Sequence, residues 1–328
     1  MKQRIIRASR LLLAAVLCAL LSCGACAGQL LIPGGQAVGI ELFGRGLLVT
    51  EVEESSCAAR AGIRRGDRII ALNGADVTSA QQLLDALEPR RPAVLQVLRG
   101  GREAEFLVEP EGGEGGCRLG VWLRDHIAGI GTVTFIDPVT GAYGALGHGV
   151  NEPGGGALLP IRTGCIVRAR VAEVRRGEQG APGELHGVFD ELAELGTVDR
   201  NTEFGIFGTF AGVPEGGAVA AADSGEVRTG AAEILSTVDG ESVQAFTVEI
   251  EKIDSRAKNG RDLRIRVTDE ALLERTGGIV QGMSGSPILQ NGKLVGAVTH
   301  VLVNDPTRGY GILIEHMLES GLDLDEAA

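Results

Sequence analysis

Glycine is the residue that most constrains how this chain can fold. It occurs 50 times among 328 positions and divides the sequence into short apolar runs, while aromatic residues make up only 3%. Because glycine adopts positive φ without strain, this spacing favours short strands joined by tight turns over long helices. We therefore expect a mainly β protein.

Length and charge limit the classes of protein to consider. A chain of 328 residues exceeds one typical domain, and a hydrophobic content of 44% is enough for two cores. The formal net charge of -12 argues against a nucleic-acid partner, which would favour clustered Lys and Arg. We expect two globular domains and no nucleic acid.

The first 27 residues have the layout of an export segment. Four basic residues stand among the first ten positions, and an apolar run over residues 11–21 follows them. Residues 20–23 resemble a lipobox, residues 25–27 an ordinary cleavage site, and the apolar run is shorter than a comfortable membrane span. A cleaved signal peptide, a lipoprotein and a retained membrane anchor all remain open.

Three cysteines lie in this segment and three in the body, which are Cys57, Cys117 and Cys165. An odd number allows at most one disulfide within a monomer, and the wide spacing matches neither a disulfide scaffold nor a zinc site. We expect free thiols that pack as small apolar residues.

Residues 37–109 have the pattern of a small α/β domain. Short apolar strands are punctuated by turns such as Asn73-Gly74, and Ser79 can cap a helix over residues 80–87. Residues 58–74 resemble the core motif of bacterial PDZ domains, although Cys57 stands where such domains often carry proline.

The PDZ resemblance implies a groove in which an extended peptide adds a strand beside the helix. Backbone N–H groups of one loop would hold the C-terminal carboxylate of that peptide. The alternative is a module that only packs against its neighbour. The predicted loop consists of Ala37, Val38, Gly39 and Ile40.

A glycine- and glutamate-rich stretch over residues 109–116 has the composition of a linker, and we predict that it connects this domain to the next one.

Residues 117–328 are expected to form a second, all-β domain, a barrel or sandwich, because short apolar runs alternate with glycine turns. Three segments have helical patterns instead, at 185–195, 270–274 and 315–320. The predicted strands cover 131–136, 166–174, 227–235, 246–253 and 263–267.

The motif Gly282-Met283-Ser284-Gly285-Ser286-Pro287 is the sharpest chemical signal in the chain. Glycine on both sides lets the backbone turn sharply, so that the N–H groups of Gly282 and Ser284 can converge on a developing oxyanion. We predict Ser284 as a nucleophile, with Ser286 as the rival.

A serine nucleophile needs an adjacent base. His148 lies between Gly147 and Gly149 after a β run, where its side chain can be exposed to a partner, whereas His126 and His186 lack such a setting. His300, on a strand soon after the serine motif, is the main alternative. We predict His148 as the general base.

Several motifs in order resemble the SpoIVB peptidase family. They cover residues 146–149, 201–208, 276–287 and 296–312. This resemblance implies a trypsin-like double β-barrel and a triad of His148, Asp269 and Ser284, with no metal or cofactor. Asp137 and Asp199 remain rivals of Asp269, which can alternatively cap a helix beginning at Glu270.

The same resemblance implies a role in sporulation signalling. Such a peptidase is exported into the space between forespore and mother cell, tethered to the membrane or released from it. It cleaves itself near the N-terminus and cleaves a regulatory partner of an intramembrane protease. The alternative is a non-catalytic PDZ-containing regulatory protein.

Overall fold

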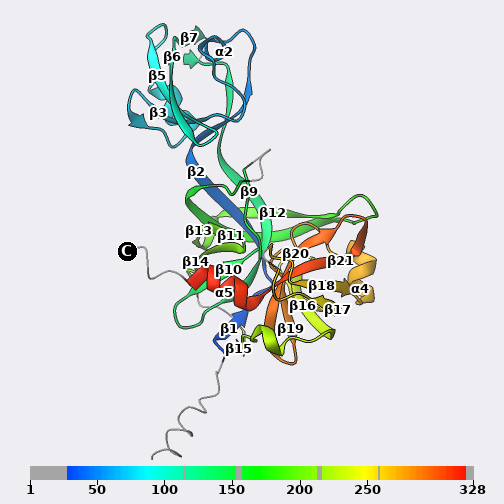
Figure 1. Ribbon diagram of the computed structural model, residues 1–328. Helices are drawn as coiled ribbons and strands as arrows, with labels where there is room; N and C mark the ends of the chain where they lie inside the picture. Colours follow the sequence, from blue (N-terminus) through cyan, green and yellow to red (C-terminus); the bar gives the residue numbers. More distant parts are fainter. Residues whose placement is uncertain (1–27, 114–115, 153–156, 213–215, 258, 323–328) are drawn as a thin grey trace, which may run out of the picture.

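The computed structural model describes residues 28–113, 116–152, 157–212, 216–257 and 259–322. Strands dominate, which confirms the predicted mainly β class. Figure 1 shows a large body and a small unit that stands on it, joined by two long strands, β2 (Ala37–Val52) and β9 (Val121–Ile136). The described helices are short. They are α2 (Cys57–Ala61), α3 (Ala80–Asp85), α4 (Glu270–Thr276), α5 (Ile314–Leu322) and the 3-10 turn η1 (Ser224–Glu226).

The C-terminal half of the body is a closed antiparallel barrel in the strand order β16-β17-β18-β21-β20-β19. Alternate side chains of each strand point inward, as in β18, where Leu263, Ile265 and Val267 are buried and the arginines between them are not. The strands are β16 (Gly230–Thr237), β17 (Val243–Ile253), β18 (Leu263–Val267), β19 (Pro287–Gln290), β20 (Lys293–Leu302) and β21 (Asp305–Leu313).

The N-terminal half of the body belongs to a 13-stranded sheet that does not close on itself among the described residues. The predicted double barrel is therefore one closed barrel and one open, curved lobe. The lobe contains the lower parts of β2 and β9 with β1 (Leu30–Pro33), β10 (Ala142–Ala145), β11 (Ile161–Arg175), β12 (Glu184–Thr197), β13 (Arg200–Thr202), β14 (Gly205–Thr209) and β15 (Val219–Ala220).

The small unit has its own core, formed around residues such as Leu83, Leu95 and Val97, which are fully buried. Ser79 accepts a hydrogen bond from the N–H of Gln82 at 3.1 Å and caps α3, as predicted. Its strands are the upper parts of β2 and β9 with β3 (Arg68–Leu72), β4 (Ala75–Asp76), β5 (Ala93–Arg99), β6 (Arg102–Val108), β7 (Glu111–Gly113) and β8 (Gly116–Arg118).

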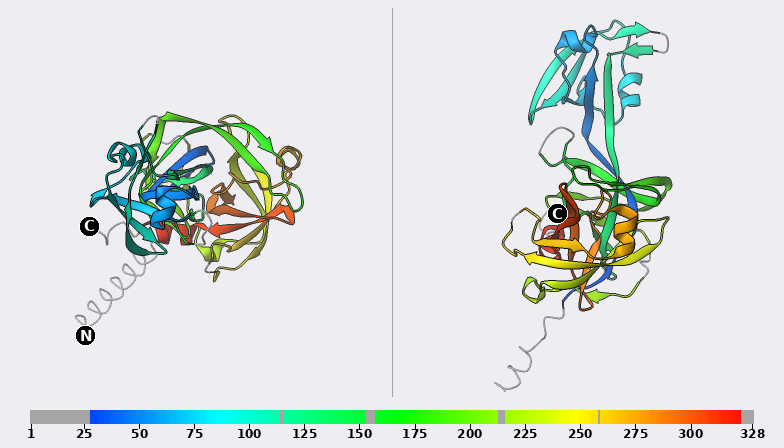
Figure 2. Two further views of the ribbon diagram at one scale, coloured as in Figure 1. Left: turned by 90° about the horizontal axis from the view of Figure 1, so that it is seen from above. Right: turned by 90° about the vertical axis from the view of Figure 1, so that its right-hand side faces the viewer.

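This unit is inserted into the body rather than placed before it, which corrects the predicted division into residues 37–109 and 117–328. The lower part of β2 pairs with β9 and β11 of the open lobe, from Ala37 opposite Thr132 onward. The two strands then continue into the small unit, as the right-hand view of Figure 2 shows. The predicted linker over 109–116 instead contains β7 and the first residue of β8, and these two strands pair with each other inside the small unit.

The insertion also corrects the predicted carboxylate-binding loop. Ala37, Val38, Gly39 and Ile40 are buried strand residues of the open lobe and belong to the body. They cannot hold a peptide terminus in the small unit. The loop was expected from the PDZ resemblance alone. In the structure Gly39 lies in the strand, where a Cβ atom would collide with the side chains of Val167 and Phe189.

The segment 185–195 is strand β12 and not a helix. Its leucines are spaced as on a helix, but the segment pairs with β11 through several bulges, and those bulges disturb the alternation expected of a strand. The helices predicted near 270–274 and 315–320 are confirmed as α4 and α5. Cys57, Cys117 and Cys165 are free thiols.

The export segment of residues 1–27 lies outside the described residues, so its predicted fates stay predictions. Among the helices that are described, none has the length and apolar character needed to cross a membrane.

Candidate functional site

The Ser284 loop forms a tight elbow between α4 and β19. Gly282 and Gly285 have φ of 98° and 97°, which side chains of L-residues rarely tolerate. The hydroxyl of Ser284 donates a hydrogen bond to the carbonyl of Thr299 at 2.8 Å. The elbow therefore holds the serine at the junction of the open lobe and the closed barrel.

Two amide groups of this elbow are free. The N–H groups of Met283, Gly285 and Ser286 donate to backbone carbonyls, whereas those of Gly282 and Ser284 have no acceptor within the described part of the chain. Buried or half-buried N–H groups are almost always paired. This pair fits the predicted oxyanion hole, in which two free donors flank the nucleophile.

His148 follows β10 through a strained turn. Leu146 and Gly147 both have φ of 69°, and positive φ is uncommon for leucine. The Nδ1 atom of His148 lies 3.0 Å from the carbonyl oxygen of Gly149, so Nδ1 carries the proton and Nε2 is left to accept one. Burial lowers the pKa of His148 below its ordinary value of 6.5, which keeps the imidazole neutral near pH 7.

The serine and histidine loops pack backbone to backbone. A Cβ atom on Gly285 would stand 2.6 Å from the Leu146 nitrogen and 2.0 Å from the Thr132 oxygen. Position 285 thus requires glycine for two reasons: its φ is positive, and the neighbouring backbone atoms leave no room for a Cβ atom. The close approach explains how two segments more than a hundred residues apart in sequence reach one site.

Two buried threonines of β9 hold the serine loop in place, and sequence reasoning missed both. The hydroxyl of Thr132 donates to the Gly282 carbonyl and that of Thr134 to the Gly285 carbonyl, each at 2.8 Å. Both side chains are fully buried. In the C-terminal part of β9, Thr132 and Thr134 alternate with apolar residues. This pattern was the available signal, because a buried hydroxyl group needs a hydrogen-bond partner.

A cavity of about 310 Å³ brings the predicted residues together, with His148, Gly282 and Ser284 in its wall. The rest of the lining comes from the open lobe and the start of the elbow. These residues are Ile40, Leu42, Ile127, Ala128, Gly129, Ile130, Leu146, Val150 and Gln281.

His300 lies close to His148, with ring centroids 5.1 Å apart. Burial, helped by His148 and Arg261, lowers the pKa of His300 to about 4. Its Nδ1 atom is buried without a hydrogen-bond partner in the described structure. His300 is thus a neighbour of His148, and it does not line the cavity that holds Ser284.

The structure does not join Asp269 to His148, which corrects the predicted triad. Asp269 caps α4, where its carboxylate accepts hydrogen bonds from the N–H groups of Leu272 at 3.0 Å and Thr247 at 3.3 Å. Oδ1 thus caps the helix, as expected for aspartate at a helix start, and Oδ2 is engaged by the Thr247 N–H of β17. The only hydrogen bond of the His148 ring in the described structure goes to Gly149.

The rival aspartates do not reach His148 either. Asp137 accepts from Gln29 and from the N–H groups of Val139 and Thr140, and Asp199 accepts from Thr197. The rival nucleophile Ser286 is fully buried, and its hydroxyl donates to Ser236 at 3.0 Å. His126 and His186 are exposed strand residues beside Asp125 and Glu184.

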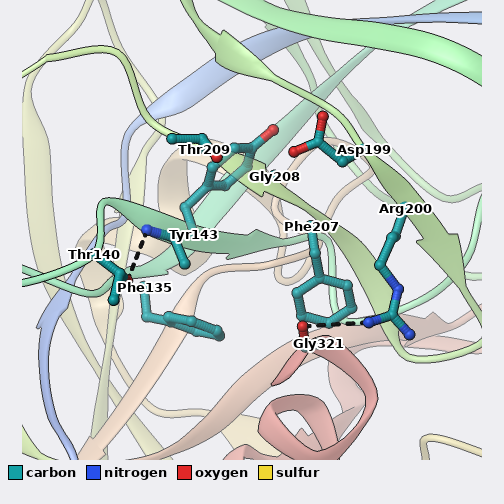
Figure 3. A pocket seen from close by; sticks show the side chains of 10 residues that line it. Phe135, Thr140, Tyr143, Asp199, Arg200, Phe207, Gly208, Thr209 and Gly321 are labelled. Atoms are coloured by element: carbon teal, nitrogen blue, oxygen red, sulfur yellow. Dashed lines mark hydrogen bonds between the residues drawn. The ribbon is translucent and has the colours of Figure 1, made fainter. Parts of the chain in front are cut away.

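A second, smaller cavity of about 180 Å³ lies on the far side of β10, toward α5. Figure 3 shows its aromatic wall of Phe135, Tyr143 and Phe207, with Arg200 near the Gly321 carbonyl. The hydroxyl of Tyr143 is engaged by the Thr197 carbonyl at 2.8 Å. His148, Asp269 and Ser284 do not line this cavity, although the rival Asp199 does.

Comparison with known families gives two matches. The sequence model described as SpoIVB peptidase S55 matches residues 115–318, and a PDZ-domain model matches residues 48–99. The first match covers more than half of the chain and contains His148 and Ser284. The second coincides with the inserted small unit, whose PDZ character is thereby confirmed.

Curated relatives match shorter stretches. The chain is 35% identical over 66 residues to human "Serine protease HTRA3", covering 20% of this chain and 15% of that protein. It is 38% identical over 65 residues to a "Probable periplasmic serine endoprotease DegP-like" of Chlamydia muridarum, covering 20% and 13%. The chain therefore spans only a small part of these relatives.

A solved structure, the active form of the Rv3671c protease from M. tuberculosis, aligns with 62% of this chain and 76% of its own at 16% identity and a TM-score of 0.37. The PDZ domain of an SdrC-like protein from Listeria monocytogenes aligns with 25% of this chain and 90% of its own, at 20% identity and a TM-score of 0.23.

Proposed function

Because this chain belongs to the SpoIVB peptidase S55 family and is thus a serine endopeptidase by class, we propose that Ser284 is its nucleophile and His148 its general base. The observation that carries the assignment is the shared cavity, whose wall holds Ser284, His148 and the free N–H group of Gly282. The remaining predicted member, Asp269, has no part in the proposal.

The reaction is acyl transfer. The Ser284 hydroxyl leaves the Thr299 carbonyl, passes its proton to Nε2 of His148 and attacks the peptide carbonyl carbon. The resulting oxyanion accepts hydrogen bonds from the N–H groups of Gly282 and Ser284. His148 then gives the proton to the departing amine, and water hydrolyses the acyl-enzyme by the same steps.

The Gly149 carbonyl takes the orienting part that an aspartate plays in other serine peptidases. It holds Nδ1–H of His148 and so leaves Nε2 free to accept a proton. A neutral carbonyl stabilises the imidazolium less than a carboxylate does, because charge-assisted hydrogen bonds are about twice as strong. We expect this site to turn over slowly compared with a site that contains a carboxylate.

A test of the assignment is labelling of the full chain with a small fluorophosphonate. We expect Ser284→Ala to abolish labelling and Ser286→Ala to retain it, since Ser286 is buried against Ser236. Labelling that persists in Ser284→Ala and disappears in Ser286→Ala would identify Ser286 as the nucleophile instead. A folded wild-type chain that never labels would favour the non-catalytic regulatory alternative.

We further propose the biological setting that the family resemblance implies. The chain is exported through its first 27 residues, stays tethered or is released, and cleaves itself and a regulatory partner of an intramembrane protease during sporulation. The basic and apolar layout of those residues supports export. Mass spectrometry of the full chain should find a cut near the N-terminus that is absent from Ser284→Ala.

A further inference from the structure

The inner wall of the cavity beside Ser284 is aliphatic. Apart from His148, none of its lining residues carries an acidic or basic side chain. An apolar cavity of about 150 Å³ already holds benzene, and this one measures about 310 Å³. Burial of a Leu or Ile side chain there would be favourable, whereas burial of an unpaired charge would be strongly unfavourable.

One strand of that wall also has an open edge. Between residues 121 and 131, β9 pairs only with β2 among the described strands. At Thr132 the edge is occupied, because the Thr132 N–H donates to the Ser284 carbonyl and the Thr132 carbonyl accepts from the Leu146 N–H, and pairing with β10 begins at Val133. Ala128 and Gly129 are exposed, and a Cβ atom on Gly129 would meet no atom within 4 Å. Unpaired strand edges are templates for an added strand.

The edge and the cavity are parts of the same surface, because Ile127, Ala128, Gly129 and Ile130 line the cavity. In an extended peptide, alternate side chains point to the same side. A peptide paired with β9 would therefore place one side chain in the cavity while its backbone passes Ser284.

Accordingly, we propose that substrates bind as an extra strand on the open edge of β9, with an aliphatic side chain next to the scissile bond in the cavity. This inference rests on the proposed peptidase function and names its substrate class. The strand that carries the PDZ unit thus also selects the substrate.

The first experiment measures kcat/KM of the full chain on quenched fluorescent peptides that differ only at the two residues flanking the scissile bond. Peptides with Leu, Ile or Val at one of these positions should be cleaved at least tenfold faster than peptides with Asp or Lys there. Equal rates for aliphatic and charged peptides would overturn the proposal.

Ala128 offers a charge-swap test, because it lies at the exposed mouth of the cavity. Ala128→Asp should lower kcat/KM for the Leu peptide about tenfold and raise it for the Lys peptide, and Ala128→Lys should instead favour the Asp peptide. Ala75→Asp, on an exposed strand of the PDZ unit, is the matched control and should change neither rate. An unchanged order of preference in both Ala128 variants would refute the assignment.

Backbone pairing is tested by N-methylation of single peptide residues, which removes one donor at a time. Along the series of singly methylated peptides, kcat/KM should fall about tenfold at every second position. Methylation at the positions between them should have little effect. A response below twofold at all positions would rule out strand addition.

Fluorophosphonate labelling of the same protein separates this inference from the proposed function. A chain that labels at Ser284 but shows no side-chain preference contradicts only this inference. A chain that does not label contradicts the proposed function.

Discussion

The serine loop and the histidine loop reach the same cavity by different means. The Ser284 elbow obtains its shape from Gly282 and Gly285 and leaves two N–H groups free. The His148 loop obtains its shape from Leu146 in a left-handed conformation and leaves its imidazole half-buried, with a lowered pKa. In the proposed mechanism the serine loop contributes hydrogen-bond donors for the substrate oxyanion. The histidine loop contributes an imidazole whose lowered pKa keeps it neutral near pH 7.

The largest expected effect tests the contact between the two loops. Gly285→Ala should destabilise the chain by roughly 3–5 kcal/mol and abolish activity, because its Cβ would collide with the Thr132 carbonyl and the Leu146 nitrogen. Gly292→Ala is the matched control, since Gly292 also has positive φ (76°) but open space around it. Chemical denaturation should show about 1 kcal/mol for this control, and an equal loss in both variants would mean that strain in φ, not the contact, explains the effect.

The second prediction separates the two histidines. His148→Ala should lower kcat by about 10²–10⁴, the usual contribution of a general base. His300→Ala should lower it less than tenfold, because His300 does not line the cavity. Steady-state kinetics on one peptide decides between them, and the reverse order of effects would make His300 the base.

The third prediction is the pH dependence. Protonated imidazole cannot accept the serine proton, so kcat/KM should fall as pH drops through the folded-state pKa of His148. Burial lowers that pKa, and the acid limb should therefore lie below pH 6.5, the ordinary value. His300→Gln should leave the limb in place, since His300 has a pKa of about 4. A midpoint above pH 6.5 would contradict the burial of the base.

Sequence patterns pointed to the two loops of the site whose backbone shape depends on nearby glycines, the Ser284 loop and the His148 loop. Glycines around Ser284 and His148 have few other reasons to cluster, so both residues could be selected without a structure. The insertion of the PDZ unit was not predictable in this way, because β2 and β9 each run through two regions as one continuous strand. Thr132 and Thr134 were missed because their partners, the carbonyls of Gly282 and Gly285, lie about 150 residues away.

Asp269 shows the opposite case, in which one local pattern fits two roles, and it gives the smallest expected effect. Asp269→Ala should cost about 1 kcal/mol of stability through loss of the α4 cap. Asp269→Ser keeps a capping oxygen but removes the charge, so it should retain both the stability and the activity of the wild type. If Asp269 instead oriented His148, the serine variant would lose about 10⁴ in kcat while remaining folded. Denaturation and kinetics on the same two variants thus distinguish a cap from a triad member.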